Sequence, residues 1–566
     1  MHATNIFLAT YAFAEVALAL NLPFGWTFPW VNAQLSNNQI PLALSVEHEE
    51  PEFSSNRIAI VGAGAAGSSA AFWIGKAKER WGLDIEVDIF ESSDYVGGRS
   101  TTVHPYNDPR LEVVEIGGSV FIEDNKNLWR ASSEFGLNLT EFTDSDSTFG
   151  STLGIWDGKE FVLRINTTGR LSQWWNTIKV LWRYGFNAPR KTNALVQSVL
   201  KRYLTLYSSE VGTAPWGDVA TISESLGYTE LTNTTGAEYL RSRGVSDLYI
   251  NEIVESVTRV NYGQNVDKIH GLETFVSLLA NTASQVVNGN WQLFDQFIKR
   301  SNASLYLNTT VTSISQKAED QYVLHTTSAN TNEVAARTYR SVILAAPYHS
   351  TGLTLKLLDE SSKPNIPPQP YIHLYVTLLS TPNPYARTRY FGLADNDAPP
   401  NMVLTTWERE RTGAGPERPE FNSASYHGRI LNKGDRSVAN LTDLGVGSPQ
   451  GRDEAGEEWV VKIFSDHPVE DSFLRKVFGR VGWVVRKEWD SYPVLPPTDT
   501  FPPVKLAKGL YYVNAFEPFM STMETETIAS RNIVELLLRE EHDASICKPG
   551  ESTAEPGPDF VYGFDC

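Results

Sequence analysis

Six residues, Gly62-Ala63-Gly64-Ala65-Ala66-Gly67, have the spacing of a loop that holds the diphosphate of a dinucleotide. The run before them, RIAIV at 57–61, favours a buried parallel strand, and SSAAFWIGKAKER after them favours a helix. In such a unit the first glycine allows the turn, the second admits the diphosphate, and the third lets the helix pack on the strand. The sequence therefore predicts that Gly62, Gly64 and Gly67 bind a dinucleotide.

The next segment indicates which dinucleotide. A second strand, IEVDIF at 85–90, ends at Glu91, 24 residues after Gly67, where an acid binds ribose hydroxyls. Gly97-Gly98-Arg99 follows and resembles the second signature of FAD enzymes of the glutathione-reductase-like and amine-oxidase-like group. Its glycines would let the chain pass close to the cofactor, and Arg99 would neutralise the diphosphate. A further pair, Gly117-Gly118, is predicted to pass the flavin.

Three distant segments complete this prediction, because FAD domains of this group are discontinuous. LNTTVTSI at 307–314 alternates like a strand, and the fold group would place its Val311 against the adenine. SVILAAP at 341–347 reads as a buried strand, and 509–538 as a strand, a turn and a long helix. Ser521, Met523 and Glu524 would begin that helix at the cofactor, with Ser521 as the cap and the positive helix end near the flavin ring.

The chain resembles the prenylcysteine oxidase (prenylcysteine lyase) family of FAD-dependent thioether oxidases. The resemblance lies in IAIVGAGAAGSSAA, VDIFESSDYVGGRSTTV with EIGGSVF, VDKIHGLETFVSLL with NGNWQLFDQF, and LYYVNAFEPFMSTMETETIASRNIVELL. In the last stretch the family positions fall on Glu517, Ser521, Met523, Glu524, Ile528, Ala529 and Asn532. The resemblance is thin from about 380 to 500, where 434–459 reads as a surface loop.

The resemblance implies a simple reaction. FAD takes a hydride from the prenyl carbon bonded to sulfur, water adds, and the hemithioacetal collapses to a prenyl aldehyde and cysteine. Oxygen then restores the flavin and yields hydrogen peroxide, so the cofactor performs the difficult step. No metal is required. His270, His349 and His373 are conceivable bases, but a single histidine without a visible partner is more often structural, and no base is assigned.

Two other functions are compatible with the same residues. An FAD oxidase of the same fold could act on a prenylated or terpenoid secondary metabolite, with an internal hydroxyl closing an ether ring. A secreted flavin-binding protein without turnover is the third. An apolar isoprenoid substrate needs a long pocket, and the segment 171–186 is rich in aromatic residues that could line it or simply pack as helices: Trp174, Trp175, Trp182, Tyr184 and Phe186.

These elements predict an α/β fold, in which a discontinuous Rossmann-like FAD-binding domain of the glutathione-reductase/amine-oxidase type carries an inserted mixed α+β substrate domain. The FAD-binding parts are 57–135, 290–350 and 505–540, and the substrate parts are 136–289 and 351–504. Helices are expected within 171–210 and 270–285. A predicted signal peptide (1–19), a predicted flexible lead-in (20–56) and a tail (541–566) account for the remaining residues.

Composition limits the remaining possibilities. The 566 residues carry a formal charge of −19, which makes nucleic-acid binding unlikely to be a function of this chain. Cys547 and Cys566 are the only cysteines, so one disulfide between them or none can form. The apolar stretch 6–20 ends in a small-x-small site at 17–19, which predicts entry into the secretory pathway; no transmembrane span is expected. Glycosylation sequons then become usable at Asn138, Asn166, Asn233, Asn302, Asn308 and Asn440.

Overall fold

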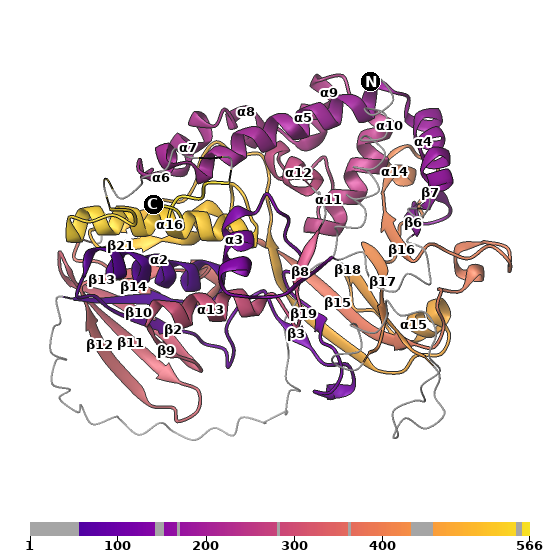
Figure 1. Cartoon of the computed structure of the whole chain (residues 1–566). Helices are drawn as coiled ribbons and strands as arrows, with labels where there is room; N and C mark the ends of the chain where they lie inside the picture. Colours follow the sequence, from indigo (N-terminus) through magenta and orange to yellow (C-terminus); the bar gives the residue numbers. More distant parts are fainter. Residues whose placement is uncertain are drawn as a thin grey trace.

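Figure 1 shows a computed structural model of the chain. It describes residues 56–141, 152–166, 170–279, 283–359, 361, 364–431, 457–548, 550, 557 and 559–566. The expected signal peptide, nearly all of the lead-in, Asn440 and most of the expected surface loop at 434–459 lie outside these residues.

A six-stranded sheet forms the centre of the cofactor-binding half, and its strands come from three distant parts of the chain. Its order is β20 (Lys505–Ala507), β21 (Leu510–Tyr512), β13 (Ser341–Leu344), β1 (Arg57–Val61), β2 (Glu86–Phe90) and β9 (Ser304–Tyr306). All neighbours are parallel except β20 and β21. Ile58 to Val61 and all of β13 are buried, as expected for strands with helices on their face.

Three helices cover this sheet. They are α2 (Ala65–Trp81), α13 (Trp291–Ser301) and α16 (Met523–His542), and α2 packs against both of the others. Figure 1 shows the C-terminal helix α16 lying beside the N-terminal helix α2. The contact brings the two ends of the sequence together at the edge of the sheet where a parallel sheet binds its ligands.

A second sheet flanks the first and contains the strand predicted at 307–314. Its order is β12 (Val334–Tyr339), β11 (Gln321–Ser328), β10 (Thr309–Ala318) and β14 (Thr354–Lys356). The strand predicted at 307–314 is β10, which begins two residues later at Thr309, and the preceding strand β9 ends at Tyr306. Asn308 between them adopts a left-handed φ of 52°, which asparagine tolerates, and this turn moves the chain from the first sheet to the second.

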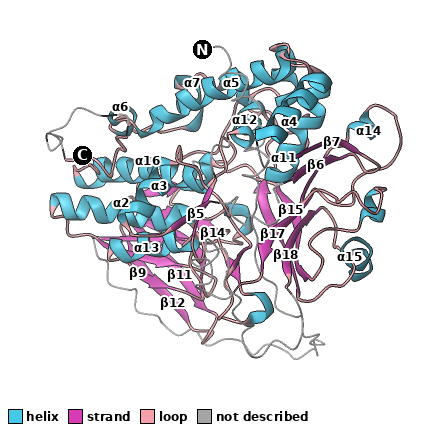
Figure 2. Ribbon diagram, turned by 45° about the vertical axis from the view of Figure 1, so that its right-hand side comes forward, coloured by secondary structure: helices cyan, strands magenta, loops and turns pink. Residues whose placement is uncertain are grey.

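The other half of the molecule is a seven-stranded sheet with a layer of helices. The order is β19 (Val484–Pro493), β15 (Tyr371–Thr381), β18 (Trp459–Ser465), β17 (Ser423–Arg429), β16 (Met402–Thr405), β6 (Thr152–Trp156) and β7 (Phe161–Asn166). Only β16 and β6 are parallel neighbours. Figure 2 shows this sheet and the helical layer of α4, α5, α11 and α12 around it.

The remaining elements are short or belong to that helical layer. Two small pairs are β3 (Thr102–Val103) with β4 (Val114–Glu115) and β5 (Leu139–Glu141) with β8 (Ser284–Val286). The helices are α3 (Lys126–Glu134), α4 (Arg170–Tyr184), α5 (Asn187–Tyr203), α6 (Ser209–Gly212), α7 (Val219–Ser225), α8 (Thr229–Thr232), α9 (Gly236–Ser242), α10 (Asp247–Tyr249), α11 (Glu255–Tyr262), α12 (Gly271–Leu278), α14 (Glu408–Arg411) and α15 (Asp471–Phe478).

The expected helix at 270–285 is only partly present. Helix α12 ends at Leu278, and Ser284–Val286 is the strand β8, which pairs with β5. The sequence between 270 and 278 is apolar enough for a helix, but the later residues are recruited by a strand partner more than 140 positions earlier in the chain. Such long-range pairing overrides local propensity.

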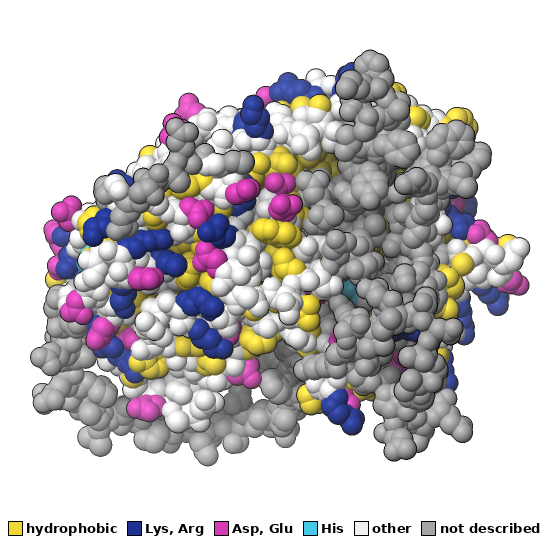
Figure 3. Space-filling view, in the orientation of Figure 1, with side chains coloured by type: hydrophobic (Ala, Val, Ile, Leu, Met, Phe, Trp, Pro, Cys, Tyr) yellow, Lys and Arg dark blue, Asp and Glu magenta, His cyan; other side chains and the backbone are white. Residues whose placement is uncertain are grey.

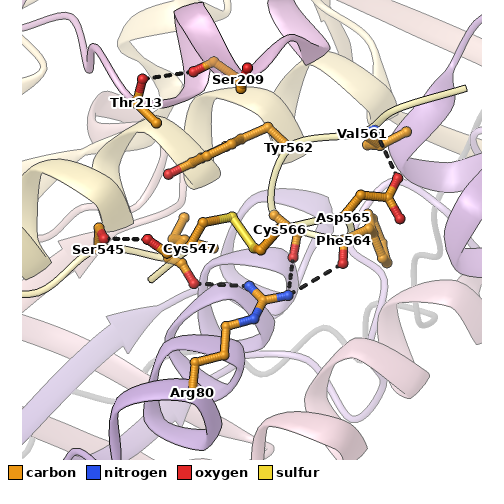
Figure 4. Close-up of a disulfide and its surroundings, with 12 residues drawn as sticks. Arg80, Ser209, Thr213, Ser545, Cys547, Val561, Tyr562, Phe564, Asp565 and Cys566 are labelled. Atoms are coloured by element: carbon orange, nitrogen blue, oxygen red, sulfur yellow. Dashed lines mark hydrogen bonds between the residues drawn. A yellow bond between two sulfur atoms is a disulfide. The ribbon is translucent and has the colours of Figure 1, made fainter. Parts of the chain in front are cut away.

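The C-terminal tail is fastened to α2. Cys547 and Cys566 form a disulfide, and Arg80 donates to the carbonyls of Ile546 and Gly563, each at 2.9 Å. Figure 4 shows the Arg80 guanidinium reaching these carbonyls beside the disulfide. In the described part of the chain, no helix is long and apolar enough to cross a membrane. On the face drawn in Figure 3, acidic and basic side chains are interspersed.

Candidate active site

One cavity of about 660 Å³ lies between the two halves of the molecule. The glycine loop after β1, the segment 97–100, Gly118 and the start of α16 line one part of it. Residues of α5, α11, α12 and β19 line the other part. Its size is within the range of small-molecule and cofactor sites.

The three glycines of the loop differ in what surrounds them. Gly62 has a φ of +104°, and a Cβ there would lie 2.6 Å from the carbonyl oxygen of Ala345. Gly64 lines the cavity, where a Cβ would meet nothing closer than Gly98 Cα at 3.8 Å. Gly67 does not line it: a Cβ there would lie 1.9 Å from the Gly62 oxygen. At Gly64 the protein therefore leaves empty space beside the backbone. A ligand that approaches the backbone closely needs such a space.

Glu91 and the pair Gly97-Gly98 line the same part of the cavity. Glu91 is buried at the cavity, where its carboxylate accepts hydrogen bonds from the amides of Ala63 at 2.9 Å and Ser93 at 2.8 Å. Gly97 and Gly98 both line the cavity with positive φ. A Cβ on Gly98 would lie 3.2 Å from the Cα of Gly64, so the two glycine segments pass each other closely.

Arg99 lines the cavity as predicted for a cofactor-binding residue, and its guanidinium also has partners within the protein. Its guanidinium forms an ion pair with Glu517, Nη2 to Oε1 2.5 Å, and donates to the carbonyl of Ser491 at 3.0 Å. The Tyr371 hydroxyl donates to the other oxygen of Glu517 at 2.6 Å. The guanidinium therefore compensates the charge of a buried carboxylate, because Glu517 is only 1% exposed and needs a cation.

Gly118 and Val311 reach the same cavity, whereas Gly117 does not. Gly118 lines it, and a Cβ there would collide with the Met523 sulfur at 2.4 Å. Gly117 lies behind, where a Cβ would lie 1.9 Å from the carbonyl oxygen of Arg99, so its role is packing. Val311 on β10 is buried and lines the cavity.

At the start of α16 the structure differs from two predictions, the capping residue and the position of Glu524. Thr522, not Ser521, caps the helix: its hydroxyl accepts from the Thr525 amide in a reciprocal capping box. Ser521 and Met523 do line the cavity. Glu524 does not; its carboxylate accepts from the amides of Asn127 at 2.8 Å and Leu128 at 3.0 Å. Glu524 thus anchors the N-terminus of α3, where a negative charge is favourable.

Several cavity residues have no signal in the sequence. Glu526 on α16 lines the cavity one turn beyond the cap. Glu517, quoted above only as a family position, is not a lining residue but forms the ion pair with Arg99. Tyr371 begins β15, and Trp489, Ser491 and Tyr492 lie on β19. The pairing of β15 with β19 brings these together, and no local motif marks either strand.

None of the three histidines considered as bases lines the cavity. His270 caps α12: its Nδ1 accepts from the Glu273 amide at 3.1 Å, and its Nε2 lies 3.2 Å from the Pro518 carbonyl. Burial lowers the pKa of His270 to about 4, so it is neutral. His349 bonds the Ile366 carbonyl, and His373 lies half-exposed between Glu488 and Asp490. Among the described residues, no group of acidic, histidine or cysteine side chains could hold a metal.

None of the described side chains of the aromatic segment 171–186 lines the cavity. Trp182 is 86% exposed and Phe186 52%, while Tyr184 is buried away from the cavity and donates to Glu252. The side chains of Trp174 and Trp175 lie outside the described residues. The apolar wall instead comes from the next helix, α5, and from the region of α12 and β4: Val199, Leu200, Val276, Leu279, Phe121 and Ile122.

The residues at this part of the cavity fit FAD: the glycines 64, 97 and 98 (the glycine cradle), Glu91 and the start of α16. A Cβ on Gly64 would have only Gly98 atoms within 4 Å, so the backbone there is open to a diphosphate, and the N-terminus of α2 lies at the same place. The fold agrees. A putrescine oxidase variant superposes with a TM-score of 0.53 at 13% identity, over 86% of this chain and 99% of that chain. Cyclohexylamine oxidase from Brevibacterium oxydans superposes with a TM-score of 0.50 at 14% identity, over 86% and 99%. Fold and site together define an FAD-dependent oxidoreductase.

The sequence relatives give the family. The model of the prenylcysteine lyase family matches residues 169–546, and that of the NAD(P)-binding Rossmann-like domain matches 60–135. Farnesylcysteine lyase of Arabidopsis thaliana is 30% identical over 85% of this chain and 88% of its own. Prenylcysteine oxidase 1 of Mus musculus is 28% identical over 86% and 90%. This chain belongs to the prenylcysteine lyase family, which confirms the resemblance predicted from its motifs.

Proposed function

We propose that this chain oxidises the allylic carbon of a prenylcysteine and releases a prenyl aldehyde and cysteine, with oxygen as the final electron acceptor. The observation that carries this proposal is the single cavity that joins the glycine cradle to an apolar wall. Bound FAD would supply the hydride acceptor. The relatives named above act on prenylcysteines by name and favour this substrate over a terpenoid that undergoes ring closure.

The chain's own residues would position the substrate and keep bulk water out. The side chains of Val199, Leu200, Val276 and Leu279 offer an apolar surface to an isoprenoid tail, whose burial drives binding. Tyr262 and Tyr492 lie between this surface and the start of α16, with ring centroids 5.4 Å apart. Aromatic faces of this kind stabilise a positive charge, and hydride loss leaves one on the allylic carbon.

The test is the reductive half-reaction without oxygen. Farnesylcysteine mixed anaerobically with the holoenzyme should bleach the flavin and release free thiol and aldehyde. A tail-saturated analogue should fail, because it cannot delocalise the cation. Deuterium on the reacting carbon should slow bleaching if hydride transfer limits it. Bleaching by simple amines but not by prenylcysteines would contradict the proposal, as would bleaching by a terpenoid alone.

We also propose that the protein enters the secretory pathway. The Cys547–Cys566 disulfide supports this, because structural disulfides persist in oxidising compartments. Asn138, Asn166, Asn233 and Asn302 are exposed, and Asn308 is half-exposed, so a glycosyltransferase could reach these sequons. Expression in a eukaryotic host should give a protein that has lost its first 19 residues and shrinks on endoglycosidase treatment. An intact N-terminus with no shift in mass would contradict this.

A further inference from the structure

Glu526 lies beside the place where a dinucleotide diphosphate binds. Ser530, one turn further along α16, donates its hydroxyl proton to the carbonyl of Ala66 at 2.6 Å. Residues four positions apart share a face of a helix, so Glu526 faces the first turn of α2 as Ser530 does. Glu526, Gly64 and Ala66 all line the cavity.

The Glu526 carboxyl lacks the partners that the neighbouring acids have. Its side chain is buried, with 6% of the residue exposed, and neither carboxyl oxygen has a hydrogen-bond partner. Glu524, two positions earlier, accepts two backbone amides and a tyrosine hydroxyl. Glu517 has Arg99 and Tyr371. A buried polar group without a partner is rare in proteins, and one at a ligand cavity indicates that the ligand supplies the partner.

The charges around Glu526 favour its protonated form. The groups that face it from other elements are Arg99, Glu517 and Tyr512. The one cation among them is already paired with Glu517, and bound FAD adds a diphosphate to the same buried space. Burial and the neighbouring Glu517 raise the pKa of Glu526 well above its usual range. A carboxylic acid can donate a hydrogen bond to an oxygen, whereas a carboxylate would repel a phosphate.

We propose that Glu526 is a cofactor ligand, a protonated carboxyl that donates a hydrogen bond to a phosphate or sugar oxygen of FAD beside the N-terminus of α2. The proposal rests on FAD being the cofactor and not on the identity of the substrate. A glutamine at this position would keep an N–H donor, whereas an alanine or a methionine would remove it.

The experiment measures FAD affinity in reconstituted apoprotein, with quenching of flavin fluorescence as the readout and no prenyl compound present. At neutral pH, Glu526→Gln should bind FAD within about threefold of the wild type, because the amide replaces the acid as donor. Glu526→Ala and the longer Glu526→Met should each bind at least tenfold more weakly. Glu540→Gln, an exposed change on the same helix, is the matched control and should have no effect.

Two results of the binding experiment would overturn the proposal. Weak binding by Glu526→Gln would show that an ionised carboxylate accepts from FAD, and unchanged binding by both donor-free variants would show that Glu526 does not contact it. Infrared difference spectra of the wild-type and Glu526→Gln holoproteins give a second measurement that does not need the alanine variant to fold. They should contain the carbonyl stretch of a protonated carboxylic acid, and its absence would overturn the proposal. The reaction with farnesylcysteine is measured separately, so its failure would not affect this result.

Discussion

The two ends of the cavity are built from different parts of the polypeptide. At the cofactor end the wall includes main chain that is exposed where Gly64 and Gly98 meet, at the N-terminus of α2. At the substrate end the wall is made of side chains from α5, α12, β15 and β19. A backbone wall needs glycines at fixed spacing, so it leaves a motif; a side-chain wall needs only apolar residues that tertiary packing brings together. Changes at the two ends should therefore have separable effects.

The largest effect is expected at Gly64. Gly64→Val should abolish FAD binding, because the added side chain occupies the space that the diphosphate needs. The apoprotein should keep its melting temperature, since a Cβ at this position would have 3.8 Å of room. Gly67→Val is the contrast and should prevent folding, because its Cβ would lie 1.9 Å from the Gly62 oxygen. Flavin absorbance and thermal melts of both variants check this; full flavin content in Gly64→Val would refute the site.

Arg99 connects the two ends of the cavity, because it follows the pair Gly97-Gly98 and donates to the Ser491 carbonyl on β19. Arg99→Ala leaves Glu517 buried without its cation and should destabilise the protein by about 3 kcal/mol. The double variant Arg99→Ala, Glu517→Gln should recover most of this loss, because it removes the uncompensated charge. Urea unfolding of the wild type and the single and double variants measures the coupling. Equal stability of the single and double variants would show that the ion pair is not what holds Arg99.

His270, which caps α12 outside the cavity, should affect acid stability rather than catalysis. Because the pKa of His270 is about 4 when folded and about 6.5 when unfolded, the unfolded state binds more protons between these values. Stability should therefore fall by up to about 3 kcal/mol as the pH drops from 6.5 to 4. His270→Asn keeps a capping oxygen and should lack this loss. Denaturant unfolding as a function of pH tests this; a large loss of turnover at neutral pH would instead argue for a catalytic role.

Glu91 tests the side-chain contribution at the cofactor end. Glu91→Ala removes an acceptor for ribose hydroxyls and for the Ala63 amide, and should weaken FAD binding by roughly 1.5 to 3 kcal/mol. Fluorescence titration of the apoprotein measures this. Affinity equal to that of the wild type would mean that strand β2 does not end at the ribose.

Leu200 tests the substrate end and should give the smallest effect. Leu200→Phe narrows the apolar part of the cavity and should lower kcat/KM for geranylgeranylcysteine relative to farnesylcysteine by about tenfold, or about 1.4 kcal/mol. FAD content should be unchanged. Equal losses for both substrates would show that the tail does not extend along α5.

Sequence patterns predicted which segments line the cavity better than they predicted the contacts of individual side chains. The glycines at 62, 64, 97, 98 and 118, together with Glu91 and Val311, all reach the cavity. Glu524 does not reach the cavity, and Arg99 has a buried partner that no local pattern marks, because the N-terminus of α3 and Glu517 lie about 400 residues away in sequence. Ser521 was one residue from the true cap, a usual error for helix ends.

The sequence by itself determined the strand–glycine–helix unit, the dinucleotide chemistry and the family, because these depend on backbone conformations that only particular residues at a particular spacing can adopt. Tertiary structure alone decided which acid holds Arg99, which acid is left at the cavity without a partner, and which helix lines the apolar wall. Those outcomes depend on contacts between distant segments, whose energies come from burial and charge pairing and leave no local pattern in the chain.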